Sequence, residues 1–346
     1  MLVSKRAVTL KDISVEIGVS VTQVSRALGG FGDVSAETRQ RVQEAALRLG
    51  YRPNAIARGL KTGRSGIVAM VVPASIEAPQ RGGMFEIVIG ISTAVSRNGM
   101  RLILHVSQPD DDPADVHEDL FKAGGIDGFI VVEPVADDQR IGRLQQLGVP
   151  YVVHGRDPKT DHHFVDVDNV ALARTMAACL RAHGHRHIAF LNGPEGFTFS
   201  EARASGFRAE LGKLEAAGGA LWILPGVMTA ERGERDVLEL LAHPNRPTAF
   251  IAGNLMLAKG VYDAAQRMSY RIPDDLSVLG HDDGLSQYPP SCFTPVIGGT
   301  RSWLKDAWSD LADLLQRLIE DGPEDAPSVV LDVAFAENRS VAKPPG

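Results

Sequence analysis

The feature that most constrains the fold is the alternation of short apolar runs and helical segments from Gly66 onward. The first apolar run, 66–73, ends in a proline and is predicted to be a buried parallel strand, followed by a helix over 85–97. Further strands are predicted at 101–106, 128–132, 148–154, 187–191, 221–224, 249–252 and 276–280, and further helices at 169–183, 201–217, 231–242, 257–268 and 303–320. Such alternation is typical of doubly wound parallel sheets, here arranged as two α/β lobes.

In doubly wound sheets, ligands bind beyond the carboxyl ends of the strands. Polar side chains gather after several of the predicted strands, and the candidate ligand site comprises Ser75, Glu133, Arg156, Arg203, Asn254 and Asp282. Planar and charged groups form paired hydrogen bonds, which suit the vicinal hydroxyls of a sugar better than a hydrophobic ligand. Arg203 and Asp282 could instead pair with each other across a closed cleft as structural ions.

The first 52 residues have a different pattern, which predicts three short helices. Thr9 with Asp12 forms the signature of a capping box, and the helix that follows ends at Gly18. Ser20 caps a second helix over 21–28, and Ser35 caps a third that ends at Gly50. Two short helices joined by a tight turn are typical of a helix-turn-helix, although a plain three-helix bundle gives the same pattern.

Charge is distributed unevenly along the chain. The 346 residues carry a formal net charge of -7, with 36 Lys and Arg against 43 Asp and Glu. The first 63 residues nevertheless hold ten Lys and Arg against five Asp and Glu, so they carry +5 and the remainder carries -12. A basic head on an acidic body favours a polyanionic partner at the amino-terminal end only. A basic, solvated helical face is the simpler alternative.

If the head binds DNA, the start of the second helix enters the major groove. The side chains placed to face the bases are Val21, Thr22, Gln23 and Arg26. Gln pairs with adenine, Arg pairs with guanine, and apolar groups contact the thymine methyl. Thr9, Ser20 and Ser25 are expected to donate hydrogen bonds to phosphates.

Three ordered motifs in this head resemble the LacI/GalR family of bacterial transcription regulators. They are TLKDISVEIGVSVTQVSRAL over 9–28, VSAETR over 34–39 and GYRPNAIARGLK over 50–61. The resemblance continues through VDN at 167–169, HGHRHIA at 183–189, RASGF at 203–207, IPDDLSV at 272–278 and GHDD at 280–283. It implies a periplasmic-binding-protein-like core with effector contacts at Arg203, Asn254 and Asp282. Leu255 departs from the Asn-Asp pair common at 254–255, and residues 192–199 with 154–156 resemble regulators of α-glucoside use.

The segment 53–61 begins with proline, which suits a helix start, but it is too short to be stable alone. We expect a helix that orders on DNA. The resemblance implies that paired hinge helices lie in the minor groove, with Leu60 wedged into a base step and with Asn54, Ala57 and Lys61 beside it. The expected domains are a head over 1–52, a hinge and linker over 53–65 and a core over 66–346. Within the core, the N-lobe is expected at about 66–165 and 296–328, and the C-lobe at about 166–295 and 329–346.

Several functional classes are disfavoured. Two cysteines, Cys179 and Cys292, are too few for a disulfide framework or a cysteine-rich metal site. His183, His185 and His187 suggest a metal alternative, but they lie where a helix gives way to a strand and lack a carboxylate at ligand spacing. The sequence contains no Gly-rich phosphate loop, G-x-S-x-G elbow or zinc motif, so an enzyme is not expected. We therefore expect neither a cofactor nor a metal.

The sequence thus predicts a homodimeric repressor that binds a near-palindromic operator and responds to a small molecule, with an α-glucoside as the favoured sugar. It contains no apolar window long enough for a membrane helix and no apolar segment behind Lys5 and Arg6, so we expect a cytoplasmic bacterial protein. The alternative is a solute receptor without a DNA role. That receptor would not need the basic head and would require a signal peptide.

Overall fold

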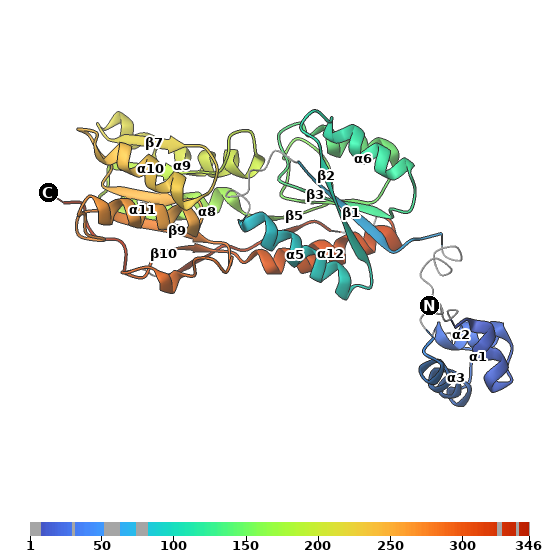
Figure 1. Cartoon of the computed structure of the whole chain (residues 1–346). Helices are drawn as coiled ribbons and strands as arrows, with labels where there is room; N and C mark the ends of the chain where they lie inside the picture. The colour runs from blue at the N-terminus through green and yellow to red at the C-terminus, as the bar shows by residue number, and fades with distance from the viewer. Residues whose placement is uncertain are drawn as a thin grey trace, which may run out of the picture. The chain divides into compact units, whose positions relative to one another are not determined.

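The computed structural model describes residues 8–29, 32–51, 63–73, 82–323, 327–336 and 339–345. The chain forms two compact units, Met1–Ser65 and Gly66–Gly346. The first is a small helical head and the second is an α/β core (Figure 1). This is the division into a helical part and a sheet-containing part that the sequence pattern predicts.

The head contains α1 (Leu10–Ile17), α2 (Val21–Leu28) and α3 (Ala36–Leu49), which confirms the three predicted helices. Gly18 ends α1 in the left-handed conformation, with φ of 70°, and so allows the tight turn into α2. The apolar sides of the helices meet in one small core, made by Ile13, Val24, Ala27, Val42, Ala45 and Ala46. This packing leaves the amino-terminal face of α2 exposed.

The N-lobe of the core is built on a parallel sheet with strand order β11-β5-β4-β3-β1-β2. Its strands are β1 (Ile67–Pro73), β2 (Arg101–Ser107), β3 (Gly128–Val132), β4 (Tyr151–His154), β5 (Phe164–Val167) and β11 (Val329–Leu331). Its helices are α5 (Gly82–Arg97), α6 (Pro113–Lys122), α7 (Gln139–Leu147) and α12 (Leu304–Glu320). Helices α5 and α12 cover one face of this sheet, and α6 and α7 cover the other.

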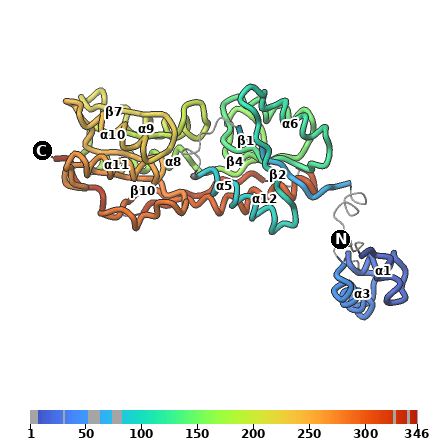
Figure 2. The backbone as a smooth tube through the Cα atoms, in the orientation of Figure 1, coloured from blue at the N-terminus to red at the C-terminus, as the bar shows by residue number. Residues whose placement is uncertain are grey.

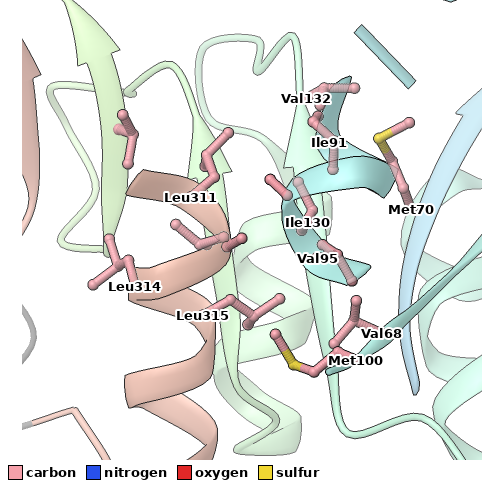
Figure 3. Packing of buried hydrophobic residues seen from close by; sticks show 14 of the residues in the cluster. Val68, Met70, Ile91, Val95, Met100, Ile130, Val132, Leu311, Leu314 and Leu315 are labelled. Carbon is pink, nitrogen blue, oxygen red and sulfur yellow. The ribbon is translucent and has the colours of Figure 1, made fainter. Parts of the chain in front are cut away.

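Figure 3 shows the packing on the first of these faces. Alternate residues of β1, Val68 and Met70, point toward Ile91 of α5, while Leu311 and Leu315 of α12 complete the cluster. Because successive side chains of a strand point to opposite faces, the intervening Ala69 contributes to the cluster under α6 and α7. The continuous apolar run of β1 therefore serves two hydrophobic clusters at once.

The C-lobe is built on a second sheet with strand order β12-β10-β9-β8-β6-β7. Its strands are β6 (His187–Leu191), β7 (Ala220–Leu224), β8 (Ala249–Ala252), β9 (Ser277–Asp282), β10 (Gly298–Arg301) and β12 (Ala334–Ala336), and all pairs are parallel except β10 with β12. Its helices are α8 (Asn169–Ala182), α9 (Thr198–Ala216), α10 (Ala230–Leu241) and α11 (Leu255–Arg267). A short 3-10 helix, η2, spans Pro290–Cys292.

The helices of the C-lobe pack in close pairs. Gly206 of α9 lies against the backbone of α8, where a Cβ would stand 2.3 Å from the carbonyl oxygen of Val170. Gly260 of α11 lies against α10 in the same way, and a Cβ there would stand 2.2 Å from the carbonyl oxygen of Ala230. Glycine is therefore required at both contacts, because any side chain would force the helices apart.

The chain passes between the lobes three times, from β5 to α8, from β10 to α12 and from β11 to β12 (Figure 2). Two of these passages differ from the expected lobe boundaries. The segment expected to begin the second N-lobe portion, 296–328, starts with β10, which pairs with β9 of the C-lobe. The segment expected in the C-lobe, 329–346, starts with β11, which pairs with β5 of the N-lobe. The apolar pattern missed both strands because β10 is Gly-rich and β11 has three residues.

Candidate functional site

The amino-terminal turn of α2 is fixed by a capping box. The Ser20 Oγ accepts a hydrogen bond from the backbone N–H of Gln23 over 3.1 Å, and the Gln23 Oε1 accepts from the backbone N–H of Ser20 over 3.1 Å. The Gln23 side chain therefore already serves a structural purpose that the sequence-based assignment to base contact did not foresee. Val21 and Thr22 remain exposed without such a constraint, whereas Val24 is fully buried in the core of the head.

Arg26 forms an ion pair with Asp33, at 2.6 Å between Nη2 and Oδ2. Both side chains are about half exposed, and the hydrogen bond from Arg26 lowers the pKa of Asp33. Exposed ion pairs are weak, so the guanidinium can exchange this partner for a base or a phosphate at small cost. The pairing holds Arg26 beside the exposed face of α2 in the absence of DNA.

The remaining predicted DNA contacts divide into two groups. Thr9 is exposed and caps α1, donating from Oγ1 to the Oδ2 of Asp12 over 2.7 Å, and Ser25 is half-buried. Four residues, Asn54, Ala57, Leu60 and Lys61, lie outside the described residues, and so does Ser75 of the effector set. Their roles remain predictions from the sequence.

In the core, Arg203 of α9 is almost completely buried at the ends of the C-lobe strands, with 8% of its surface exposed. Its Nε donates to the Oδ1 of Asn169 over 2.8 Å, and its Nη1 donates to the carbonyl oxygen of Gly253 over 2.9 Å. The guanidinium lies over the ring of Phe199, 5.1 Å from its centroid. Burial lowers the pKa of Arg203 to about 10, against the opposing effect of the nearby carboxylates of Asp283 and Asp166.

Asn169 connects Arg203 to a second charged group. Its Nδ2 donates to the Oδ1 of Asp166 over 3.1 Å, and the Oδ2 of Asp166 pairs with the Nε of Arg156 over 3.1 Å. Burial raises the pKa of Asp166 to about 6. The result is a continuous network, Arg156–Asp166–Asn169–Arg203, in which the first two residues belong to the N-lobe and the last two to the C-lobe. It brings together two candidate residues, Arg156 and Arg203, that are distant in the sequence.

Asp282 pairs with Arg301 rather than with Arg203, at 3.3 Å between Oδ2 and Nε. The alternative of an ion pair between Arg203 and Asp282 is therefore not what the structure shows. The neighbouring Asp283 is the acid whose charge acts on Arg203, and burial raises the pKa of Asp283 to about 6. Trp303 lies beside these groups, with the Nζ of Lys305 3.8 Å from its ring centroid.

Glu133 and Asn254 occupy the strand ends where the sequence placed them, but their surroundings differ. Glu133 follows β3 with a positive φ of 51°, and burial raises its pKa against the effect of the Arg140 guanidinium. Asn254 caps α11, because its Oδ1 accepts from the backbone N–H of Leu257 over 2.9 Å. Its acceptor oxygen is thus committed to the helix. Its Nδ2 donates to the carbonyl oxygen of Met228 over 3.5 Å, which leaves one amide N–H for a ligand.

Two aromatic side chains mark the place where the lobes touch. Phe197 and Phe199 stack with ring centroids 6.0 Å apart, and Phe197 forms an antiparallel bridge with Val135 of the N-lobe. The N–H of Thr198 donates to the carbonyl oxygen of Pro134 over 3.0 Å. The aromatic pair therefore lies next to Arg203 and directly at the junction between the lobes.

Sequence reasoning missed several members of this site. They are Asp166, Asn169, Phe197, Phe199, Asp283, Arg301 and Trp303. A signal was present for some of them, because VDN at 167–169 and GHDD at 280–283 are two of the motifs that resemble the family. The partner of each charged residue could not be derived from the sequence, because it depends on how the loops meet.

The three histidines considered as metal ligands point to different neighbours. His185 is buried between the hydroxyls of Thr248 and Ser277, while His183 contacts the carbonyl oxygen of Cys179 and His187 lies near Trp222. Within the described ranges, no three His, Cys, Asp or Glu side chains are grouped so as to hold a metal ion. In the same ranges no helix combines the length and apolarity needed to cross a membrane.

A cavity of about 360 Å³ lies apart from the candidate residues, at the end of β7. It is lined by Ile223, Leu224, Pro225, Gly226, Val227, Arg232, Arg235 and Asp236. The buried Arg232 guanidinium donates to the carbonyl oxygens of Leu224 and Asn192 and pairs with Asp236. Its hydrogen-bonding capacity is largely used within the protein, so this cavity offers little to a ligand.

Comparison with known protein families finds one match within the head and one within the core. The model for bacterial regulatory proteins of the lacI family matches residues 9–54, and the model for the periplasmic binding protein-like domain matches residues 177–341. The HTH-type transcriptional regulator AglR of Rhizobium meliloti (strain 1021) is 36% identical over 313 residues, which cover 89% of this chain and 87% of AglR. The HTH-type transcriptional regulator RafR of Escherichia coli is 32% identical over 345 residues, which cover 97% of this chain and 99% of RafR.

Solved structures give the same result for the fold. A complex of the transcriptional regulator CelR with cellobiose aligns with a TM-score of 0.66 at 25% identity, covering 96% of this chain and 99% of that one. A lac repressor dimer bound to operator and the anti-inducer ONPF aligns with a TM-score of 0.78 at 22% identity, covering 97% and 100%. The second likeness shows a shared fold.

Proposed function

The chain belongs to the lacI family of bacterial regulatory proteins, which are DNA-binding transcription regulators, and on this basis we propose that it is a cytoplasmic repressor controlled by a sugar. Two copies bind a near-palindromic operator, because a two-fold dimer presents its two heads symmetrically. The observation that carries the proposal is the polar network Arg156–Asp166–Asn169–Arg203. It joins the lobes in the same chain that carries the helix-turn-helix head.

Sequence discrimination comes from α2. Val21 and Thr22 are exposed at its start and contact thymine methyl groups, and Arg26 leaves Asp33 to donate to a guanine. Thr9, Ser20 and Ser25 position the head on phosphates, while Gln23 holds the capping box and contacts adenine only when that box opens. Leu60, with Asn54, Ala57 and Lys61, supplies the minor-groove contacts.

The effector binds at the ends of the strands of both lobes. Arg203, Asp282, Arg156 and the amide nitrogen of Asn254 provide hydrogen bonds to hydroxyl groups, together with Glu133 at the end of β3. Ser75 is a further contact expected from the sequence. Phe197 and Phe199 offer an apolar surface to the sugar ring. Residues 192–199 resemble regulators of α-glucoside use, which makes an α-glucoside the first candidate.

Effector binding alters DNA affinity through the lobes. A ligand that inserts into the Arg156–Asp166–Asn169–Arg203 network changes the contacts between the lobes, and the N-lobe transmits this change to the segment over 53–65. The coupling free energy of such systems is about 1 to 3 kcal/mol. It is reciprocal, so operator DNA must change the affinity for the effector by the same factor.

The test begins with the full-length protein and a library of random duplexes. A near-palindromic sequence should be enriched, and its binding should weaken steeply with salt because phosphate contacts release counterions. The enriched duplex is then titrated in the presence of sugars and sugar phosphates. Absence of any enriched sequence, with or without these compounds, would contradict the proposal and leave a solute receptor as the better account.

A further inference from the structure

We infer that the effector is an uncharged sugar and not a sugar phosphate. The inference rests on the proposed function and concerns the charge of the ligand at that same site. The charged side chains at the strand ends of this site include four cations and four anions, so positive charge does not prevail among them. The cations are Arg156, Arg203, Arg301 and Lys305, and the anions are Glu133, Asp166, Asp282 and Asp283.

Two of the arginines are already neutralised by carboxylates. Arg156 pairs with Asp166 over 3.1 Å, and Arg301 pairs with Asp282 over 3.3 Å. The carboxylates of these pairs are more enclosed than the guanidinium groups, with 11% and 14% of their side-chain surface exposed. A phosphate that took either arginine would leave a largely enclosed carboxylate without its counterion, which is strongly unfavourable.

Among the described residues, Arg203 has no carboxylate partner in an ion pair, but its surroundings also disfavour a phosphate. Its Nε and Nη1 donate to neutral oxygens of Asn169 and Gly253, and one face of its guanidinium lies over the ring of Phe199. The carboxylates of Asp283 and Asp166 oppose the lowering of its pKa by burial, and Asp166 is at the same time the ion-pair partner of Arg156. A phosphate next to Arg203 would therefore also meet these two acids, whereas a hydroxyl group can donate to them.

The starts of α8, α11 and α9 do not supply an anion-binding position either. Helix N-termini bind phosphate through their free N–H groups. In α8 the Oδ1 of Asp168 accepts from Ala171 over 2.9 Å, and in α11 the Oδ1 of Asn254 accepts from Leu257 over 2.9 Å. In α9 the N–H of Thr198 is bonded to Pro134, and Glu201 adds a negative charge to the first turn. The start of α12 has no side-chain cap, but the N–H of Leu304 donates to the carbonyl oxygen of Asp283 over 2.9 Å and Asp306 adds a negative charge to the first turn.

Inorganic phosphate probes the charge preference of the site directly, because it carries the anionic group without a sugar. We expect the full-length protein to show no saturable binding of phosphate at about 10 mM in calorimetry. Asp282→Asn removes the acid that neutralises Arg301, and Asp166→Asn does the same for Arg156, so each variant should acquire saturable phosphate binding below about 10 mM. Asp275→Asn is the matched control, because it releases Arg271 from an exposed pair elsewhere on the core.

The outcomes separate this inference from the proposed function. Saturable phosphate binding by the unmodified protein that is lost in Arg203→Leu would overturn the inference, and so would Asp282→Asn and Asp166→Asn variants that gain nothing beyond the control. A phosphorylated sugar as the tightest ligand in the panel would also overturn it, while leaving sugar-controlled DNA binding intact. A neutral sugar as the tightest ligand, together with the gain in the variants, would support it.

Discussion

The Nε of Arg203 donates to the Oδ1 of Asn169 over 2.8 Å, and this bond fixes a buried cation to the first residue of α8. Asn169 comes directly after the passage of the chain from the N-lobe sheet into the C-lobe. A ligand that changes the position of Arg203 therefore acts on the connection between the lobes.

Replacing Asn169 by Ala should destabilise the core. The change removes the acceptor for Arg203 and the donor for Asp166, and each of these residues has only 8% of its surface exposed. Loss of a partner for buried polar groups costs about 1 to 3 kcal/mol. Chemical denaturation measures the effect, with Asn245→Ala in an exposed loop as the control. Equal stability of the two variants would show that the network contributes little.

Replacing Arg26 by Ala should relax base preference while preserving the fold. The Arg26–Asp33 pair is exposed and lies outside the small core of the head, so its loss affects packing little. A bidentate contact to guanine contributes about 1 to 3 kcal/mol of discrimination, so preference at one position of each half-site should fall by roughly tenfold or more. Binding-site selection checks this. Asp33→Ala is the control and should retain the preference, and an unchanged base preference in Arg26→Ala would refute the role of this residue.

Stability should fall in acid partly through His185. Burial lowers the pKa of His185 to about 4, whereas its ordinary value is 6.5. The unfolded chain therefore binds a proton at higher pH than the native chain, so this contribution is complete above pH 6.5 and is lost as the pH falls from 6.5 through 4. The full effect is up to about 3 kcal/mol.

Denaturation of the unmodified protein and of His185→Gln at pH 7 and at pH 4.5 isolates this residue, because the other histidines titrate equally in both. The stability of the variant should depend less on pH. His243→Gln, at an exposed position, is the control and should follow the unmodified protein. Parallel curves for His185→Gln and the unmodified protein would contradict the assignment.

Replacing Leu311 by Ala should reduce the stability of the core by about 2 to 5 kcal/mol, because a buried leucine leaves both lost contacts and a cavity. Leu311 is fully buried between α12 and the N-lobe sheet. Met268→Ala is the control, because Met268 is 37% exposed and should change stability by about 1 kcal/mol or less. Thermal denaturation followed by circular dichroism measures both.

The long elements of the fold could be predicted because their apolar spacing is regular. The pattern located α2 at its observed bounds and located β3, β6 and β8 in the same way. It missed β5, β10, β11 and β12. Asp166 interrupts the apolar run of β5, β10 is Gly-rich, and β11 and β12 are only three residues long. Such strands form because the backbone of a neighbouring strand is available for pairing, and the local sequence does not show where such a neighbour lies.

The sequence names candidate site residues, and the structure adds the contacts that each of the described ones makes. Strand ends pointed to Arg156 and Asp282, and the family resemblance pointed to Arg203; the structure places all three in charged or polar contacts. The alternative of an ion pair between Arg203 and Asp282 differs from the observed pair of Asp282 with Arg301, because the sequence does not show which arginine lies closer to this carboxylate. Asn254 shows a second limit, since an Asn between a strand and a helix fits a helix cap as well as a ligand contact.

The outer strands β11 and β12 lie within eight residues of each other, yet each completes a different sheet. Removal of the chain after α12 would therefore take away an edge strand from the sheet of each lobe at the same time. The two halves cannot be separated into independent pieces by dividing the gene at a single point. Their stabilities are tied through this shared tail, which also acts as a tether that limits how far one half can swing from the other.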